Sequence, residues 1–270
     1  MKGFLPWLGG KHYLAKTIVP LIEAVPHTCY VEPFMGAAHV FFRRENPAKS
    51  EVLNDLNGDL VTLFRVLQHH LEEFMRHFKW ALVSRDEFYR LDRQPPDTLT
   101  DIQRAARFYY LHKLSVAGRT WSRAFRTKTD GPPQLNLLRL EEELSAVHLR
   151  LARVQIEHLP WADCVQRYDR EHTFFYLDPP YHGVEDYYGK GLFERGEFEQ
   201  LADVLAGLRG RFLLSLNDTP EVRAIFKHFH IRTVSQRYPS GSHSPNHVDR
   251  VTELLIGDRP FEAAQGRPLE

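Results

Sequence analysis

The chain has 270 residues, of which 43% are hydrophobic and 26% are charged, with 35 basic and 35 acidic side chains. A chain of this size and composition can bury a full core as one α/β domain, or as one domain with an insertion. Because the formal net charge is zero, a nucleic-acid partner would have to be attracted by a local basic patch and not by the protein as a whole.

The sequence also argues against membrane, disulfide and metal classes. Its longest apolar runs, such as residues 174–177, are far shorter than the roughly 20 residues that a membrane span needs. The N-terminal segment lacks the apolar stretch of a secretory signal, so we expect a cytoplasmic protein. Cys29 and Cys164 have no Cys-x-x-Cys partner, and the 15 histidines lack companions at ligand spacing. We therefore expect neither a disulfide nor a bound metal.

The first half of the chain alternates short β-rich runs with helical patterns. Residues 29–32 read as a strand that enters a small-residue turn at 33–38, and residues 39–43 begin a helix. A second strand at 51–53 ends at Asn54-Asp55. From Asp59 to Lys79, apolar residues recur every three or four positions, which predicts one amphipathic helix. This alternation is typical of a sheet with parallel strands.

The second half continues with helices, one irregular segment and the remaining strands. We expect helices at 86–93 and at 100–114, the second capped by Thr100. Residues 116–133 are rich in Gly, Arg, Ser and Thr and predict a loop or hairpin, followed by a helix at 138–151. Strands are expected at 154–156, 174–177, 211–216, 231–234 and 251–256, with helices at 198–208 and from Asp218 onward. The fold class is therefore α/β.

The most informative stretch is an apolar strand that stops at Asp178-Pro179-Pro180-Tyr181. The nitrogen of an exocyclic amine is a poor nucleophile, because its lone pair is delocalised into the ring. A carboxylate from Asp178 and a carbonyl from Pro179, its direction fixed by two consecutive prolines, would accept the amine hydrogens and orient that lone pair. Tyr181 would offer a flat face to an unstacked base. The alternative is a strand end with a Pro-Pro turn and a surface aromatic.

Two further segments have the composition of a nucleotide site. The turn at Gly36 would let a ligand approach the backbone, and Asp55 follows 19 positions later at the end of the next strand, where nucleotide-binding βαβ units bond a ribose. Asp55 could instead cap a helix. The flexible pair Gly9-Gly10 could bring Trp7 and Lys11 to a ligand, or the segment could be an N-terminal turn with a packed Trp.

Positive charge is concentrated between residues 104 and 139, where eight basic side chains occur with one acid, Asp130. Trp121, Phe125 and small residues are interleaved with them, as suits a loop that enters a groove or fills the space of an extruded base. A solvated loop is the alternative. The candidate DNA-binding residues are Lys113, Gly118, Arg119, Arg123, Arg126 and Lys128.

Together these motifs resemble the Dam-type (D12 class) DNA adenine N6-methyltransferases. The resemblance rests on Trp7-x-Gly-Gly-Lys11, Glu32-Pro33-Phe34-x-Gly36, Asn54-Asp55-x-Asn57 and Asp178-Pro179-Pro180-Tyr181, in that order, and it continues in 215–219 and 247–255. It implies a Rossmann-like S-adenosylmethionine-dependent methyltransferase fold. Residues 1–60 and 152–270 would form the catalytic and cofactor-binding domain, and residues 61–151 a mainly helical target-recognition insertion.

The resemblance also implies roles for single residues. Asp178, Pro179, Pro180 and Tyr181 would be catalytic, and S-adenosylmethionine would be bound by Trp7, Gly10, Lys11, Phe34, Gly36, Ala38, Asp55, Asp163 and Asp178. Two positions depart from the pattern. Pro6 stands where such enzymes often have a lysine, and Ala38 replaces the second glycine of the turn.

These observations predict a site-specific DNA adenine N6-methyltransferase that acts on an adenine flipped out of double-stranded DNA, without a metal. We expect a monomer, and a cognate restriction nuclease is a candidate partner. Two other functions stay open: methylation of RNA adenine or of cytosine N4, and DNA binding without catalysis on a methyltransferase fold. Sites for cytosine N4 usually begin with Ser where this chain has Asp178, which favours adenine.

Overall fold

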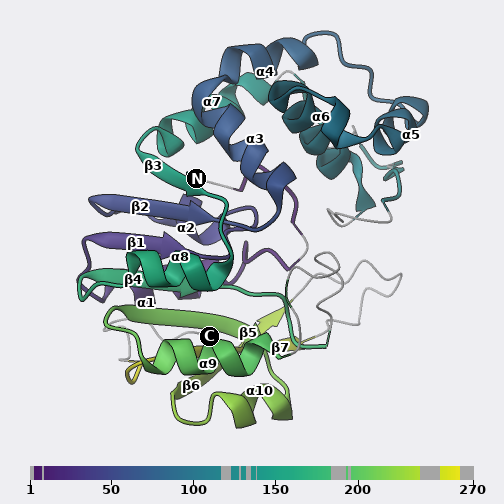
Figure 1. The fold of residues 1–270 in the computed structure, drawn as a ribbon. Helices are drawn as coiled ribbons and strands as arrows, with labels where there is room; N and C mark the ends of the chain where they lie inside the picture. Colours follow the sequence, from purple (N-terminus) through teal and green to yellow (C-terminus); the bar gives the residue numbers. More distant parts are fainter. Residues whose placement is uncertain are drawn as a thin grey trace.

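A computed structural model describes residues 3–7, 9–116, 123–127, 129–131, 135–137, 139–183, 193, 196–237 and 250–261. These residues form a seven-stranded sheet with the order β3-β2-β1-β4-β5-β7-β6 (Figure 1). The strands are β1 (Cys29–Glu32), β2 (Ser50–Asn54), β3 (Val154–Glu157), β4 (Thr173–Leu177), β5 (Arg211–Asn217), β6 (His230–Arg237) and β7 (Arg250–Gly257). Neighbouring strands among β3, β2, β1, β4 and β5 pair in parallel, whereas β7 runs antiparallel to β5 and β6. The predicted α/β fold is confirmed.

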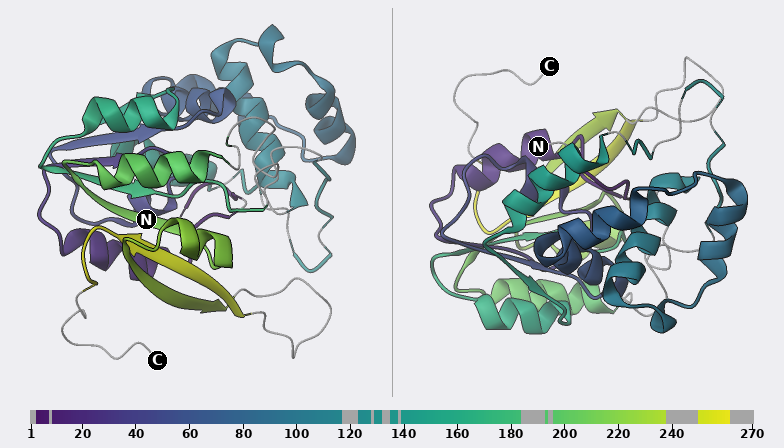
Figure 2. Two further views of the ribbon diagram at one scale, coloured as in Figure 1. Left: turned by 60° about the horizontal axis from the view of Figure 1, so that its bottom comes forward. Right: turned by 90° about the horizontal axis from the view of Figure 1, so that it is seen from above.

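Helices cover both faces of the sheet (Figure 2). One face packs against α1 (Ala15–Glu23) and α2 (His39–Arg43), and the other against α8 (Trp161–Tyr168), α9 (Glu197–Ala206) and α10 (Pro220–Ile225). The central strand β4 shows why: Phe174 and Tyr176 belong to one core cluster, and Phe175 and Leu177 to the other. Successive side chains of a strand point to opposite faces, so a fully apolar strand requires a helix layer on each side.

The remaining helices form a cluster beside the edge strand β3, at the top of Figure 1. They are α3 (Gly58–His69), α4 (Leu71–Phe78), α5 (Arg85–Arg93), the short 3₁₀ helix η1 (Pro96–Thr98), α6 (Asp101–Leu114) and α7 (Leu140–Leu151). The ring of Phe4 joins this cluster to α2, because its centroid lies 5.6 Å from Phe64, 6.4 Å from Tyr109 and 5.5 Å from Phe42 of α2. Helix α3 begins before residue 61, so the division into two units at residues 60 and 151 stays a prediction.

Two expected features of the helices differ from the structure. Residues 59–79 form two helices instead of one, because the backbone of His70 leaves the helical region at φ −135° and ψ 38°. Apolar spacing continues across this break, so periodicity alone could not show it. Helix α8 was not predicted. Neither was helix α1, which contains Pro20, a residue that lacks an N–H and normally interrupts a helix. Its apolar residues Ala15, Ile18 and Ile22 nevertheless face the core.

The predicted caps at the N-termini of two other helices are confirmed. Thr100 caps α6 as part of a capping box, in which its side chain accepts from Gln103 N and Gln103 reaches back to the Thr100 backbone. Thr219 caps α10 by accepting from Val222 N, with Pro220 at the first helical position. Such caps depend on residues close in sequence, which is why they can be read without tertiary information.

Candidate active site

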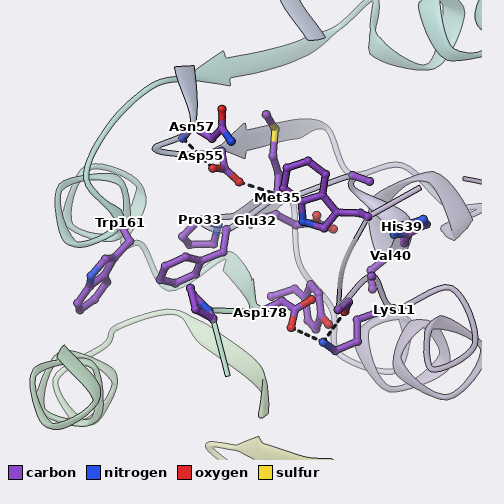
Figure 3. Close-up of a pocket in the computed structure, with 18 of the residues that line it drawn as sticks. Lys11, Glu32, Pro33, Met35, His39, Val40, Asp55, Asn57, Trp161 and Asp178 are labelled. Atoms are coloured by element: carbon purple, nitrogen blue, oxygen red, sulfur yellow. Dashed lines mark hydrogen bonds and ion pairs between the residues drawn. The ribbon is translucent and has the colours of Figure 1, made fainter. Parts of the chain in front are cut away.

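The functional motifs meet where β1, β2 and β4 end. In a parallel sheet these carboxyl ends lie at one edge, and β1 and β4 are neighbours where the strand order reverses, which is the usual ligand site of such folds. The N-terminal segment Trp7–Lys11 lies across this edge. A pocket there is lined by residues from all four motifs, among them Trp7, Lys11, Phe34, Gly36, Asp55 and Asp178 (Figure 3).

The turn after β1 brings its backbone close to Trp7. Gly36 has φ 48°, and a Cβ added there would lie 2.8 Å from the indole Nε1 of Trp7, so a larger residue would displace the indole. Ala38 also has a left-handed conformation, with φ 52°, although it carries a side chain. Such a conformation costs a non-glycine residue about 1–2 kcal/mol. Ala38 is buried but does not line the pocket, whereas its neighbours Ala37 and His39 do.

Trp7 connects the pocket to the helical cluster beside β3. Its ring stacks on His112 of α6, with centroids 5.4 Å apart and planes inclined by 14°. Burial lowers the pKa of His112 to about 3, so the imidazole is neutral and can pack against the indole face. A wall of the pocket therefore depends on α6, a contact that the motifs of the sequence did not indicate.

Asp55 joins the turn after β1 to the turn after β2. Its Oδ2 accepts a hydrogen bond from Gly36 N at 3.0 Å, and its Oδ1 accepts one from Asn57 N at 2.9 Å. Burial raises the pKa of Asp55, while these backbone N–H groups oppose the rise. The side chain thus fixes the backbone of two turns and also lines the pocket, whereas α3 is capped by Asn57 and not by Asp55.

Aromatic rings form another wall of the pocket. Phe34 stacks on Trp161, with centroids 6.1 Å apart, and Trp161 donates its Nε1–H to Glu197 at 2.8 Å. Trp161 and Leu159 line the pocket, but Asp163 does not and is exposed on α8. A role for Asp163 in cofactor binding stays a prediction that its position does not support. The chain offers Trp161, two residues earlier, at the corresponding place.

Asp178 lies directly after β4 and has two polar partners. Its Oδ1 lies 2.6 Å from Lys11 Nζ and accepts a hydrogen bond from Ser215 Oγ at 3.1 Å (Figure 3 shows the pair with Lys11). Among the described residues, none donates to its Oδ2. Burial raises the pKa of Asp178, and Lys11 opposes this rise. Burial also opposes the charge of Lys11, but Asp178 and its other neighbours hold the Lys11 pKa well above its ordinary value.

The residues after Asp178 surround this ion pair. The ring of Tyr181 lies 4.5 Å from Lys11 Nζ, in a cation–π contact. Burial raises the pKa of the Tyr181 phenol, so it stays protonated at neutral pH. Pro180 lines the pocket together with Gly10, while Pro179 is buried and does not line it. The structure therefore brings Lys11, Asp178 and Tyr181 together, a contact that the sequence analysis did not predict.

Comparison with known proteins agrees with this geometry. The sequence profile of the D12 class N6 adenine-specific DNA methyltransferases matches residues 7–239, which contain all four motifs. The chain belongs to this family. The type II methyltransferase M.CviBI of Paramecium bursaria Chlorella virus NC1A is 24% identical over 267 residues, covering 95% of this chain and 99% of that protein.

Two bacterial proteins are similar over comparable lengths. The type II methyltransferase M1.LlaDCHI of Lactococcus lactis subsp. cremoris is 25% identical over 283 residues, covering 95% of each chain. The DNA adenine methylase of Escherichia coli strain K12 is 24% identical over 284 residues, covering 96% of each. The resemblance inferred from the motifs is confirmed, and the enzyme is a DNA adenine methyltransferase.

The basic residues between positions 104 and 139 are partly neutralised by acids from other segments. Lys113 lies 3.5 Å from Glu143, and Arg123 lies 3.0 Å from Asp92. Arg126 is exposed. The other candidate DNA-binding residues, Gly118, Arg119 and Lys128, lie outside the described residues.

Two arginines of α6 also have internal partners. Arg104 is paired with Asp59 of α3. Arg107 is buried and donates to the backbone carbonyls of Leu91 at 2.7 Å and Asp92 at 3.0 Å. These arginines hold the helices together, so the positive charge available to DNA is smaller than the sequence count suggests.

Two residues at or next to the pocket, Glu32 in its lining and Asn54 beside Asp55, were not identified as functional from the sequence. Glu32, at the end of β1, is buried and accepts a hydrogen bond from Tyr30 OH at 2.7 Å; burial raises its pKa to about 8. Asn54 donates from its side-chain amide to the carbonyls of Pro33 and Leu159 and accepts from Leu159 N. Both residues lie inside motifs that the sequence analysis recognised. Glu32 is next to Pro33 and Asn54 is next to Asp55, and these positions were the signal by which the two residues could have been identified.

The described residues contain no group of three or more His, Cys, Asp or Glu side chains that could hold a metal ion. Within the same part of the chain, no helix is both long and apolar enough to cross a membrane.

Proposed function

We propose that this DNA adenine methyltransferase transfers a methyl group from S-adenosylmethionine to N6 of an adenine flipped out of double-stranded DNA. The observation that carries the proposal is the position of the Asp178 carboxylate. It lies at the end of β4, beside the glycine turn and the aromatic walls of one pocket, with Lys11 and Ser215 on one oxygen. A ligand and a target amine could therefore meet at this carboxylate.

The residues of the pocket fit S-adenosylmethionine in shape and in hydrogen-bonding groups. The close approach of Gly36 to Trp7 leaves room that a side chain would fill, and Phe34 with Trp161 offers flat faces for a purine ring. Asp55 lies where a ribose could be bonded. Asp178 supplies a carboxylate beside the ammonium group of Lys11, and Glu32 supplies a carboxyl group that is protonated at neutral pH and can form a hydrogen bond with a ligand. The cofactor would supply an activated methyl group carried on a sulfonium.

The protein would act on the target base by positioning and electrostatics. Asp178 and the Pro179 carbonyl accept the hydrogens of N6 and direct its lone pair towards the methyl group. Lys11 and Ser215 hold the Asp178 carboxylate, so that its geometry is set before the base arrives. Tyr181 presents a ring to the flipped base, and the aromatic contact compensates part of the cost of unstacking.

The helical insertion would position the DNA. Helices α5 and α6 project beyond the carboxyl edge of the sheet, on the same side as the pocket (Figure 1). The segment between α6 and α7 contains Arg126 and the candidate residues Arg119 and Lys128. We expect phosphate contacts from this segment. An enzyme of this kind would act on DNA in the cytoplasm as a monomer, and a restriction nuclease of the same target sequence is a candidate partner.

Modified-base sequencing tests the proposal directly. DNA from cells that produce the protein should contain N6-methyladenine within one short target sequence, and DNA from cells that produce Asp178→Ala should not. In vitro, the purified chain should transfer the labelled methyl group of S-adenosylmethionine to duplex DNA. Methylation of cytosine N4, of RNA in preference to DNA, or binding of DNA with no transfer at all would each contradict the proposal.

A further inference from the structure

A second carboxylate lies behind the catalytic ion pair. Glu253 of β7 is fully buried, at 0% exposure, and its Oε2 lies 3.8 Å from Lys11 Nζ. The Lys11 side chain is only 2% exposed and lies 2.6 Å from Asp178. One ammonium group is therefore shared by two carboxylates, one facing the pocket and one inside the sheet.

We propose that Glu253 is a positioning residue for methyl transfer. Its carboxylate shares the positive charge of Lys11 with Asp178. Lys11 therefore holds Asp178 in place, while Asp178 keeps enough negative charge to accept the hydrogens of the target amine. This inference rests on the proposed function of Asp178. Lys11 alone would pair fully with Asp178 and weaken it as an acceptor. With Glu253, the three groups carry a net negative charge at the point where the amine hydrogens arrive.

The sheet topology fixes Glu253 in this position. Strand β7 is inserted between β5 and β6, and Glu253 pairs with Asn217 on one side and with Val234 on the other. Ser215 of β5 donates its hydroxyl hydrogen to Asp178 and accepts a hydrogen bond from Tyr176 OH at 2.9 Å. Neighbouring strands thus hold the groups around Asp178 rigidly, as an electrostatically preorganised site requires.

The charge of Glu253 also affects the pH at which Asp178 ionises. Five titratable groups surround Asp178 and come from four parts of the fold: Lys11 of the N-terminal segment, Glu32 at the end of β1, Tyr176 and Tyr181 around the end of β4, and Glu253 of β7. Burial raises the pKa of Asp178, Lys11 lowers it, and Glu253 raises it. Removing the negative charge of Glu253 should therefore let Asp178 ionise at lower pH.

Glu253→Gln separates this role from a structural one, because glutamine has the same shape without the charge. The single-turnover rate of methyl transfer to duplex DNA should fall about 10- to 100-fold, while the Kd values for S-adenosylmethionine and DNA change by less than about threefold. The acid limb of the rate against pH should move to lower pH. A residue that only filled space would leave that limb unmoved.

The matched control is Glu157→Gln, which removes a carboxylate at the end of β3, at the far edge of the sheet from β7. It should keep both the wild-type rate and the wild-type acid limb. A second variant, Glu253→Asp, keeps the charge but shortens the side chain. It should lower the rate and retain the wild-type limb, and it keeps the test open if the glutamine variant does not fold.

A folded Glu253→Gln enzyme with a rate within about twofold of wild type, or with an unmoved acid limb, would overturn the role of Glu253. So would a Glu253→Asp limb displaced from that of wild type. The wild-type enzyme is measured first. If it transfers no methyl group to DNA, the proposed function fails; if it is active and the Glu253 variants match it, only this inference fails.

Discussion

The buried carboxyl group of Glu32 should make the stability of the enzyme depend on pH. Its side chain is 1% exposed and accepts a hydrogen bond from Tyr30 OH. Burial raises its pKa from 4.5 to about 8, since the charged form loses its hydration inside the protein. Glu32→Gln imitates the protonated carboxyl group, because the amide oxygen can still accept from Tyr30.

The sign follows from the direction of this pKa change. The folded protein holds the Glu32 proton more tightly than the unfolded chain does, so folding is not penalised below about pH 4.5 and is penalised increasingly as the pH rises to about 8. At about 1.4 kcal/mol per pKa unit, the full penalty is at most about 5 kcal/mol. Glu32→Gln should therefore match the wild type at pH 5 and exceed its stability at pH 9 by up to that amount.

Urea unfolding of both proteins between pH 5 and pH 9 measures the difference. Glu45→Gln, at an exposed position between α2 and β2, is the control for replacing a glutamate with glutamine, and its stability curve should run parallel to that of the wild type. If the free energies of unfolding of Glu32→Gln and wild type differ by a constant amount across this range, Glu32 is ionised in the fold at neutral pH and the reasoning is refuted.

Three further predictions concern the pocket and the insertion. Asp178→Ala should slow methyl transfer by well over tenfold, because the lost carboxylate orients the amine and holds Lys11; single-turnover rates within about tenfold of wild type, about 1.4 kcal/mol, would remove Asp178 from its proposed role. Asp55→Ala should weaken cofactor binding by roughly 1.5–3 kcal/mol per lost charge-assisted hydrogen bond and also lower stability, since its carboxylate holds Gly36 N and Asn57 N. Calorimetry that shows unchanged cofactor affinity alongside a lowered stability would make Asp55 purely structural. Arg126→Ala should weaken DNA binding and make its salt slope shallower by up to about 0.9, with cofactor affinity unchanged; a salt titration with an unaltered slope would show that Arg126 contacts no phosphate.

The sequence by itself determined the fold class and the family. Apolar strands that end in short polar motifs, such as Leu177 followed by Asp178, place chemistry at the edge of a parallel sheet because strand direction and side-chain alternation are local properties. The cap at Thr100 and the turn at Gly36 were readable for the same reason, since each depends on residues within a few positions.

Tertiary structure decided which charges meet. Lys11 and Asp178 lie at opposite ends of the recognised motifs, and only the crossing of the N-terminal segment over the end of β4 brings them to 2.6 Å. In the same way, Asp92 lies outside the basic stretch of the sequence but neutralises Arg123 within it.

The position of β7 is the clearest case. Nothing in the apolar pattern of Val251–Ile256 shows that this strand enters the sheet antiparallel between β5 and β6. That insertion buries Glu253 behind Lys11. Apolar periodicity reports which face of an element is buried, whereas a long-range ion pair depends on which elements become neighbours, and the chain settles that choice only when its core packs as a whole.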